Sequence, residues 1–332
     1  MDIAAFLAEP ALGKPLWAWL LFLGLVMLLL WLDLAVLHRK THKISLRESL
    51  LTYGGYVALA LCFGLWIWHE MGGEAAMAYY TGYFIEQSLA MDNLFVISLV
   101  FAAFGVPAIH QHRVLFWGIL GVVLLRGIMI GVGAALVANF HWVLYFFGAF
   151  LVFTGIKMLV MGDKEPDVAN NRMLLWLKRR MRVTDGVRGE HFFVREPDPV
   201  RGGKPLLWAT PLFMALLAIE VIDLVFAVDS VPAIFAITTD PYLVYTSNIF
   251  AILGLRTLYF ALSAMLHRFR YLKPALALVL IVIGAKIFLN DIVGKIDPAI
   301  SLAVTLSILG GGVVFSLVKT RREGGGAESV ST

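Results

Sequence analysis

Long apolar runs separated by short polar segments dominate the chain from residue 16 onward. A helix needs about 20 mainly apolar residues to cross a bilayer. The pattern predicts about nine membrane-spanning helices, at residues 16–37, 51–69, 79–104, 114–138, 142–161, 207–237, 242–266, 275–292 and 299–318. The run at 207–237 is too long for one straight span, and Pro232 predicts a break or kink in it. The predicted fold class is an all-α polytopic membrane protein.

Positively charged residues alternate between the loops. The loop after the first run carries Arg39, Lys40, Lys43 and Arg47, the next loop is acidic, and the alternation continues to the last run. Because cytoplasmic loops are enriched in Lys and Arg, the N-terminus is predicted outside and the C-terminus inside.

The longest loop, residues 162–206, holds ten Lys or Arg residues and lies on the predicted cytoplasmic side. It contains "NRMLLWLKRRMRV", which fits either a basic amphipathic helix on the inner leaflet or a solvated linker. We expect one transmembrane domain over residues 1–318 and a disordered cytoplasmic tail at 319–332.

Composition supports a membrane protein. The chain is 60% hydrophobic and 15% charged, with a mean hydropathy of +0.83. The net charge of +4 resides in short loops, so it indicates topology rather than a nucleic-acid partner. The single cysteine, Cys62, excludes an intramolecular disulfide and a cysteine metal cluster.

Two parts of the chain resemble each other. "EQSLAMDN" at 86–93 and "DLVFAVDS" at 223–230 each have a carboxylate, an Asp six residues later and then a small polar residue. Further equivalent pairs follow in the same order: Arg126 and Arg256, Gly155 and Gly284, and Lys157 and Lys286. Each repeat contains three spans, so the copies at 79–161 and 207–292 are predicted to be inverted. Inverted repeats place a binding site near the membrane midplane.

Six carboxylates fall within predicted spans: Asp33, Glu86, Asp92, Glu220, Asp223 and Asp229. Each costs roughly 2.5–3.5 kcal/mol at a span centre, so each is expected to face protein or water. We expect Arg126 and Arg256 to pair with two of them, while Lys157 and Lys286 either pair or extend to the interface. Two carboxylates remain even if all four cations pair. This surplus favours a divalent cation or protons.

Oxygen ligands favour a hard ion such as Mn²⁺, Mg²⁺ or Ca²⁺, and the histidines lie in loops or at span edges. On one intact helix, Asp92 points about 120° away from Glu86. Either the helices break near Asp92 and Asp229, or ligands from both repeats converge while other carboxylates face arginines. Asp33 lies near the inner end of the first span, where it either pairs with local basic residues or lines the ion path.

The chain resembles the TerC family, and in particular its Alx branch. The resemblance rests on "LDLAVLHRK", "EQSLAMDNLFVI", "ALLAIEVIDLVFAVDSVPAIFAIT" and "GAKIF". It implies a multi-pass protein of the bacterial cytoplasmic membrane that exports Mn²⁺. The ion-site residues it implies are Glu86, Asp92, Asn93, Glu220, Asp223, Asp229 and Ser230.

We therefore expect a secondary transporter that exports Mn²⁺ against protons, with Asp92 and Asp229 as the principal ion ligands. No Walker A sequence is present, and neither enzymatic activity nor an organic cofactor is expected. Three alternatives stay open. They are a transporter of another cation or small solute, a scaffold that uses the 162–206 loop, and an intramembrane aspartyl protease, although the spans lack the G-x-G-D sequence that such proteases resemble.

Overall fold

The computed structural model describes residues 9–32, 46–140, 142–161, 181–197, 205–262, 272–294 and 296–328. The helices are α2 (Leu16–Leu32), α3 (Leu46–Met71), α4 (Gly73–Ala103), α5 (Ala108–Asn139), α6 (Trp142–Met161), α8 (Pro211–Phe235), α9 (Pro241–Leu253), α10 (Leu255–Leu262), α11 (Leu272–Val293) and α12 (Pro298–Glu328). The described residues also form two antiparallel strand pairs: β1 (Pro10–Ala11) with β2 (Lys14–Pro15), and β3 (Phe193–Pro197) with β4 (Pro205–Ala209).

Within the described residues, seven helical segments are long and apolar enough to cross a membrane. They are α3, α4, α5, α6, α8, the α9–α10 pair and α12. Two further apolar helical segments are shorter, at Leu16–Leu32 in α2 and Pro274–Asn290 in α11. The prediction of a mainly helical, polytopic membrane protein is confirmed.

Two of the predicted spans differ in detail from the structure. The run at 207–237 begins in strand β4, and helix α8 then continues through Pro232 to Phe235 without a break. Proline removes one helical hydrogen bond, but here only three residues of the helix follow it. Conversely, the run at 242–266 is divided at Gly254, between α9 and α10.

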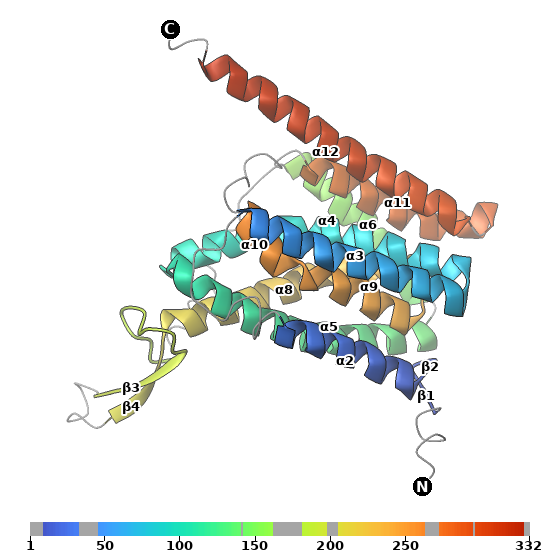
Figure 1. Ribbon diagram of the computed structural model, residues 1–332. Coiled ribbons are helices and arrows are strands. Elements are labelled where there is room, and N and C mark those ends of the chain that lie inside the picture. The colour runs from blue at the N-terminus through green and yellow to red at the C-terminus, as the bar shows by residue number, and fades with distance from the viewer. Residues whose placement is uncertain are drawn as a thin grey trace.

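The helices lie side by side in one bundle, with α2 and α12 on opposite flanks (Figure 1). Helices from 79–161 pack mainly against helices from 207–292: α4 on α9, α5 on α8, and α6 on α11. The two segments therefore interleave, and buried side chains of one face those of the other.

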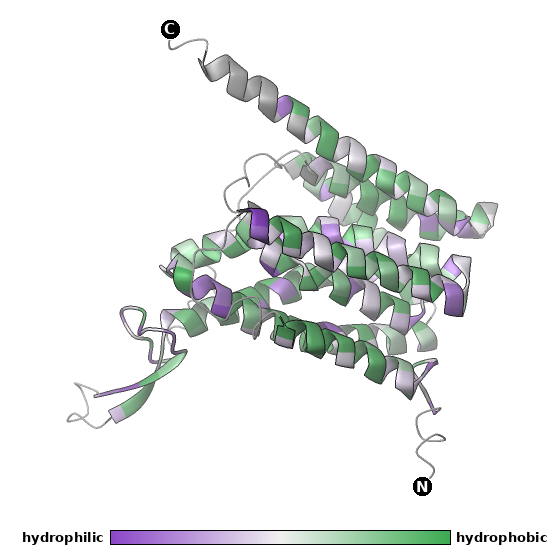
Figure 2. Ribbon diagram, in the orientation of Figure 1, coloured by the Kyte–Doolittle hydropathy of each residue, from purple (hydrophilic) through white to green (hydrophobic). Residues whose placement is uncertain are grey.

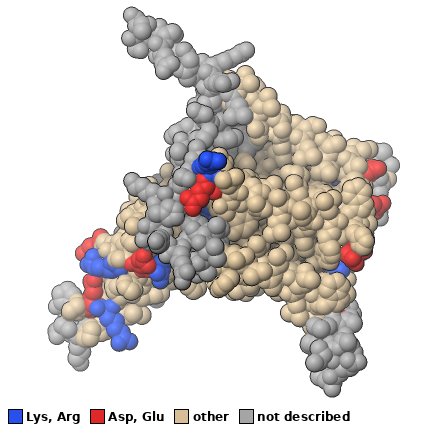
Figure 3. Space-filling view, viewed as in Figure 1, with Lys and Arg blue, Asp and Glu red and all other residues tan. Residues whose placement is uncertain are grey.

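The outer faces of the bundle are apolar (Figure 2). Large side chains such as Leu65, Leu124 and Val160 are exposed on different helices. On the face drawn in Figure 3, described charged residues gather at the ends of the bundle, with a belt of other residues between them. An apolar belt between charged ends is the distribution that a lipid bilayer requires.

The β3–β4 hairpin begins in the predicted 162–206 loop, ends at Ala209 and extends away from the bundle (Figure 1). Arg113 of α5 donates to Glu190 at 2.9 Å and so links the segment before the hairpin to the bundle. Neither interpretation of the loop predicted this hairpin. Residues 162–180, where the amphipathic helix was considered, lie outside the described residues.

The C-terminal helix is longer than predicted. Helix α12 continues to Glu328, so residues 319–328 are helical rather than a disordered tail, and 329–332 lie outside the described residues. The sequence after Pro298 contains no proline to end the helix.

Glycines allow the backbones of α6 and α11 to approach each other closely. A Cβ atom added to Gly155 would lie 2.6 Å from the backbone oxygen of Ala277. A Cβ atom added to Gly284 would lie 2.6 Å from the backbone oxygen of Gly148. Small residues at helix crossings allow the close packing by which membrane helices associate.

We expect Gly155→Leu to destabilise the protein by about 1–3 kcal/mol or more, because the new side chain must push α11 away from α6. Thermal unfolding in detergent micelles measures the loss. Gly131→Leu on α5 is the matched control, since a Cβ atom there meets nothing within 4 Å. Equal melting temperatures for both variants would contradict the close crossing.

Candidate functional site

Arg126, near the middle of α5, is only 1% exposed. Its guanidinium meets the Asp223 carboxylate of α8 side-on. Arg126 Nε donates to Oδ2 at 3.1 Å, and Nη2 donates to Oδ1 at 3.0 Å. A two-bond pairing of this kind is among the strongest that side chains make, and it fixes both orientation and distance.

The remaining terminal nitrogen of Arg126 is held by three oxygens. Nη1 donates to Glu86 Oε1 of α4 at 2.8 Å and to Ser230 Oγ of α8 at 2.7 Å. It also donates to Asn248 Oδ1 of α9 at 3.2 Å. Side chains from three helices therefore converge on one point inside the bundle.

The protein does not fully compensate the charges and polar atoms of the cluster that Arg126 forms with Glu86, Asp223, Ser230 and Asn248. Two carboxylates, Glu86 and Asp223, face one guanidinium, which leaves a formal charge of −1 if both are ionised. Among the described residues, Glu86 Oε2 and Asn248 Nδ2 are buried without a hydrogen-bond partner. Uncompensated buried polar atoms are costly, so such groups favour an additional ligand.

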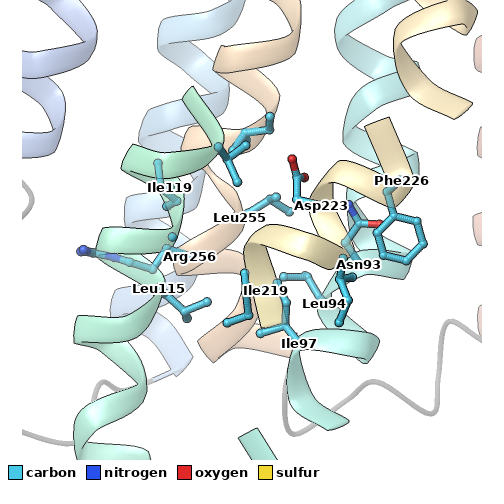
Figure 4. A pocket seen from close by; sticks show the side chains of 14 residues that line it. Asn93, Leu94, Ile97, Leu115, Ile119, Ile219, Asp223, Phe226, Leu255 and Arg256 are labelled. Carbon is cyan, nitrogen blue, oxygen red and sulfur yellow. The ribbon is translucent and has the colours of Figure 1, made fainter. Parts of the chain in front are cut away.

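A cavity of about 40 Å³ lies beside Asp223. Asn93 and Asp223 lie on one side of it and Arg256 on the other (Figure 4). The other walls are mostly apolar, including Leu94 and Ile219. A water molecule needs roughly 10–15 Å³ of such space, so this cavity is large enough for water or a small ion.

Glu220 lies one turn before Asp223 on α8 and packs against α5. A Cβ atom added to Gly121 would collide with the Glu220 carboxylate, so this glycine provides the space for it. Among the described residues, Glu220 Oε2 is buried and has no hydrogen-bond partner. The structure places Glu220 outside the set of groups that contact Arg126.

Asp229 faces a different helix. Its Oδ1 accepts a hydrogen bond from Thr154 of α6 at 3.4 Å, and Lys157, one turn further along α6, attracts it electrostatically. The Asp92 side chain lies outside the described part of the structure. The assignment of Asp92 and Asp229 as principal ion ligands therefore stays a prediction.

The predicted ion-site residues are only partly brought together. Glu86, Asp223 and Ser230 meet at Arg126, whereas Asn93 lines the cavity and Glu220 and Asp229 point elsewhere. In the described ranges, no three His, Cys, Asp or Glu residues are grouped so that they could hold a metal ion. The observed cluster is an arginine site with mixed oxygen acceptors.

Helices α4 and α8 are continuous, so the alternative of helix breaks near Asp92 and Asp229 was wrong. Carboxylates at equivalent positions of the two predicted repeats, Glu86 and Asp223, instead converge on one arginine. Lys157 is exposed and Lys286 is half-buried on α11, while Asp33 lies outside the described residues.

Asn248 was missed by the sequence interpretation. It follows Thr246 and Ser247 in α9, and all three are fully buried. Thr246 and Ser247 bond to backbone oxygens of their own helix, whereas Asn248 reaches Arg126 on α5. Three consecutive polar residues within an apolar run were the signal that identifies this position.

A family model, the integral membrane protein TerC family, matches residues 71–324. An uncharacterized membrane protein of Myxococcus xanthus, STKORF319, is 46% identical over 313 residues, covering 94% of this chain and 95% of the relative. The "Putative membrane-bound redox modulator Alx" of Salmonella typhi is 44% identical over 306 residues, covering 90% and 92% of the two chains. No solved structure shows a significant match. The chain belongs to the TerC family of integral membrane proteins.

Proposed function

We propose that this protein is a secondary transporter that exports Mn²⁺ from the cytoplasm in exchange for protons. The observation that carries the proposal is the buried cluster of Glu86, Arg126 and Asp223, which holds two carboxylates against one guanidinium inside an apolar bundle. Ionisable residues within membrane spans are costly, and they commonly mark ion pathways.

The choice of ion rests on ligand chemistry. The groups that converge on Arg126 are carboxylate, hydroxyl and amide oxygens, which suit hard divalent cations. Protons are the proposed exchange ion because the same carboxylates can bind either species.

We further propose that Glu220, Asp229 and Asp92 lie along the ion path. We also propose that the protein resides in the bacterial cytoplasmic membrane, with its N-terminus outside.

We also propose that residues 79–161 and 207–292 are inverted repeats. The glycine contacts between α6 and α11 support this, because they are reciprocal. Gly155 faces Ala277, and the equivalent Gly284 faces Gly148, and the members of each equivalent pair are 129 positions apart in the sequence. A two-fold relation between the repeats produces contacts of this kind.

We expect purified protein in liposomes loaded with Mn²⁺ to release the ion, and to release it faster when a pH gradient supplies protons in the opposite direction. Parallel loading with Mg²⁺, Ca²⁺ and Zn²⁺ tests selectivity. A Glu86→Gln, Asp223→Asn double variant is expected to be inactive, while the Glu190→Gln variant, altered outside the bundle, is the matched control. Release of an organic cation but no metal would favour the alternative substrate class, and no release of any solute would favour a scaffold.

A further inference from the structure

We propose that Arg126 is an internal cation that occupies the position of the transported cation when the site is empty. Glu86, Ser230 and Asn248 hold Arg126 Nη1 in this state, and a divalent cation displaces the guanidinium from the same oxygens. This inference rests on the proposed function and adds a specific competitor and a further binding residue, Asn248.

The geometry around Nη1 is that of a cation site. Three oxygens lie within 3.2 Å of this one nitrogen, and they come from α4, α8 and α9. A metal ion at that point would need each oxygen to approach by at most about 1.2 Å, since hard divalent cations bind oxygen at roughly 2.0–2.6 Å. Glu86 Oε2, buried without a partner among the described residues, would add a fourth oxygen.

The charges also favour replacement. Arg126 neutralises one of the two carboxylates that it contacts, whereas a divalent cation would neutralise both. Because buried charge is stabilised only when it is well compensated, a divalent ion is the better match for Glu86 and Asp223. Arg126 therefore stabilises the empty site and competes with the ion for the same oxygens.

The structure provides room for the exchange. The cavity of about 40 Å³ shares the Asp223 side chain with the cluster. Its polar wall includes Asn93, the residue equivalent to Ser230 in the other repeat. An ion or water entering this cavity reaches Asp223 and can open the two-bond pairing that holds Arg126 in place.

Equilibrium binding tests the competition. Full-length protein in nanodiscs is titrated with Mn²⁺, and free Mn²⁺ is measured by electron paramagnetic resonance. If Arg126 occupies the oxygens in about nine molecules of ten, Arg126→Gln should bind Mn²⁺ about tenfold more tightly than the unaltered protein. Arg113→Gln, on the same helix but paired with Glu190 outside the bundle, should bind with unchanged affinity.

The Arg126→Lys variant distinguishes occupation of the ion position by the Arg126 side chain from simple charge repulsion. Lysine retains the positive charge but cannot make the two-bond pairing with Asp223, so it should compete less well. Occupation therefore predicts tighter Mn²⁺ binding by Arg126→Lys than by the unaltered protein. Equal affinity of these two proteins would overturn the proposal, even if Arg126→Gln binds more tightly.

A second background guards against loss of folding in Arg126→Gln. In Asp223→Asn protein, adding Arg126→Gln returns the cluster to a formal charge of −1 and should again tighten binding relative to Asp223→Asn alone. No tightening in either background, in protein that exports Mn²⁺ when unaltered, overturns the competition but leaves the proposed function standing. Unaltered protein that neither binds nor exports Mn²⁺ would instead overturn the proposed function itself, and with it this inference.

Discussion

Arg126→Ala protein is expected to accumulate in the membrane at a small fraction of the normal level. The substitution leaves Glu86 and Asp223 buried without their common cation, which destabilises a folded protein by about 3–5 kcal/mol. That loss is a large share of a typical folding free energy of about 5–15 kcal/mol. Quantitative immunoblotting of membranes and thermal unfolding in detergent measure the effect.

Removing the orphaned charges should reverse the loss. Glu86→Gln and Asp223→Asn, combined with Arg126→Ala, leave a neutral cluster and should recover most of the abundance. Arg113→Ala is the matched control, because Arg113 lies on the same helix and its partner Glu190 is half-exposed. An exposed pair contributes only about 0–1 kcal/mol. Normal abundance of the Arg126→Ala variant would show that the ion pairs do not stabilise the bundle.

Asp223→Asn protein is expected to lose nearly all Mn²⁺ efflux. The substitution preserves the size of the side chain but removes its charge, and the amide that replaces the carboxylate can accept only one of the two Arg126 hydrogen bonds. Efflux is lost because the carboxylate is a proposed ligand of the ion, and without its charge Glu86 and Arg126 form a neutral pair that no longer attracts a divalent cation. Efflux from loaded liposomes, normalised to reconstituted protein, is the measurement.

Asp229→Asn supplies the comparison, because it makes the same chemical change two turns along the same helix. Asp229 faces Thr154 and Lys157 rather than Arg126. If the cluster at Arg126 holds the ion, Asp229→Asn should reduce efflux less than Asp223→Asn does. The reverse order would move the principal site to Asp229 and return to the assignment favoured by the sequence pattern.

The sequence was a good guide to the helices because apolar length is a local property. Span 142–161 coincides with helix α6, and the interior of each other described span is helical apart from the turn at Gly254. Local patterns were less informative where tertiary contacts decide the structure. The β3–β4 hairpin follows a basic segment with no clear strand alternation, and Pro232 lies too close to the end of α8 to interrupt it.

The site was predictable in composition and less so in geometry. Buried carboxylates and Arg126 were evident because charge is rare in apolar runs. Which carboxylates would meet depends on how α4, α5 and α8 rotate about their axes, and helical periodicity alone left two arrangements open. Asn248 was missed because an uncharged amide stands out less in an apolar run than an ionised side chain does.

The reciprocal glycine contact of α6 and α11 bears on how such a chain could have arisen. Gly155 of α6 faces Ala277 of α11, and Gly284 of α11 faces Gly148 of α6. Gly284 is the equivalent of Gly155, and Ala277 is the equivalent of Gly148. An interface between two identical subunits related by a two-fold axis has the same property, since one patch serves both sides. The inverted repeats that we propose therefore imply a half-length ancestor that inserted in both membrane orientations and formed this crossing as an antiparallel homodimer. Fusion of two such genes would retain the crossing. The two equivalent arginines, Arg126 and Arg256, would then be free to diverge.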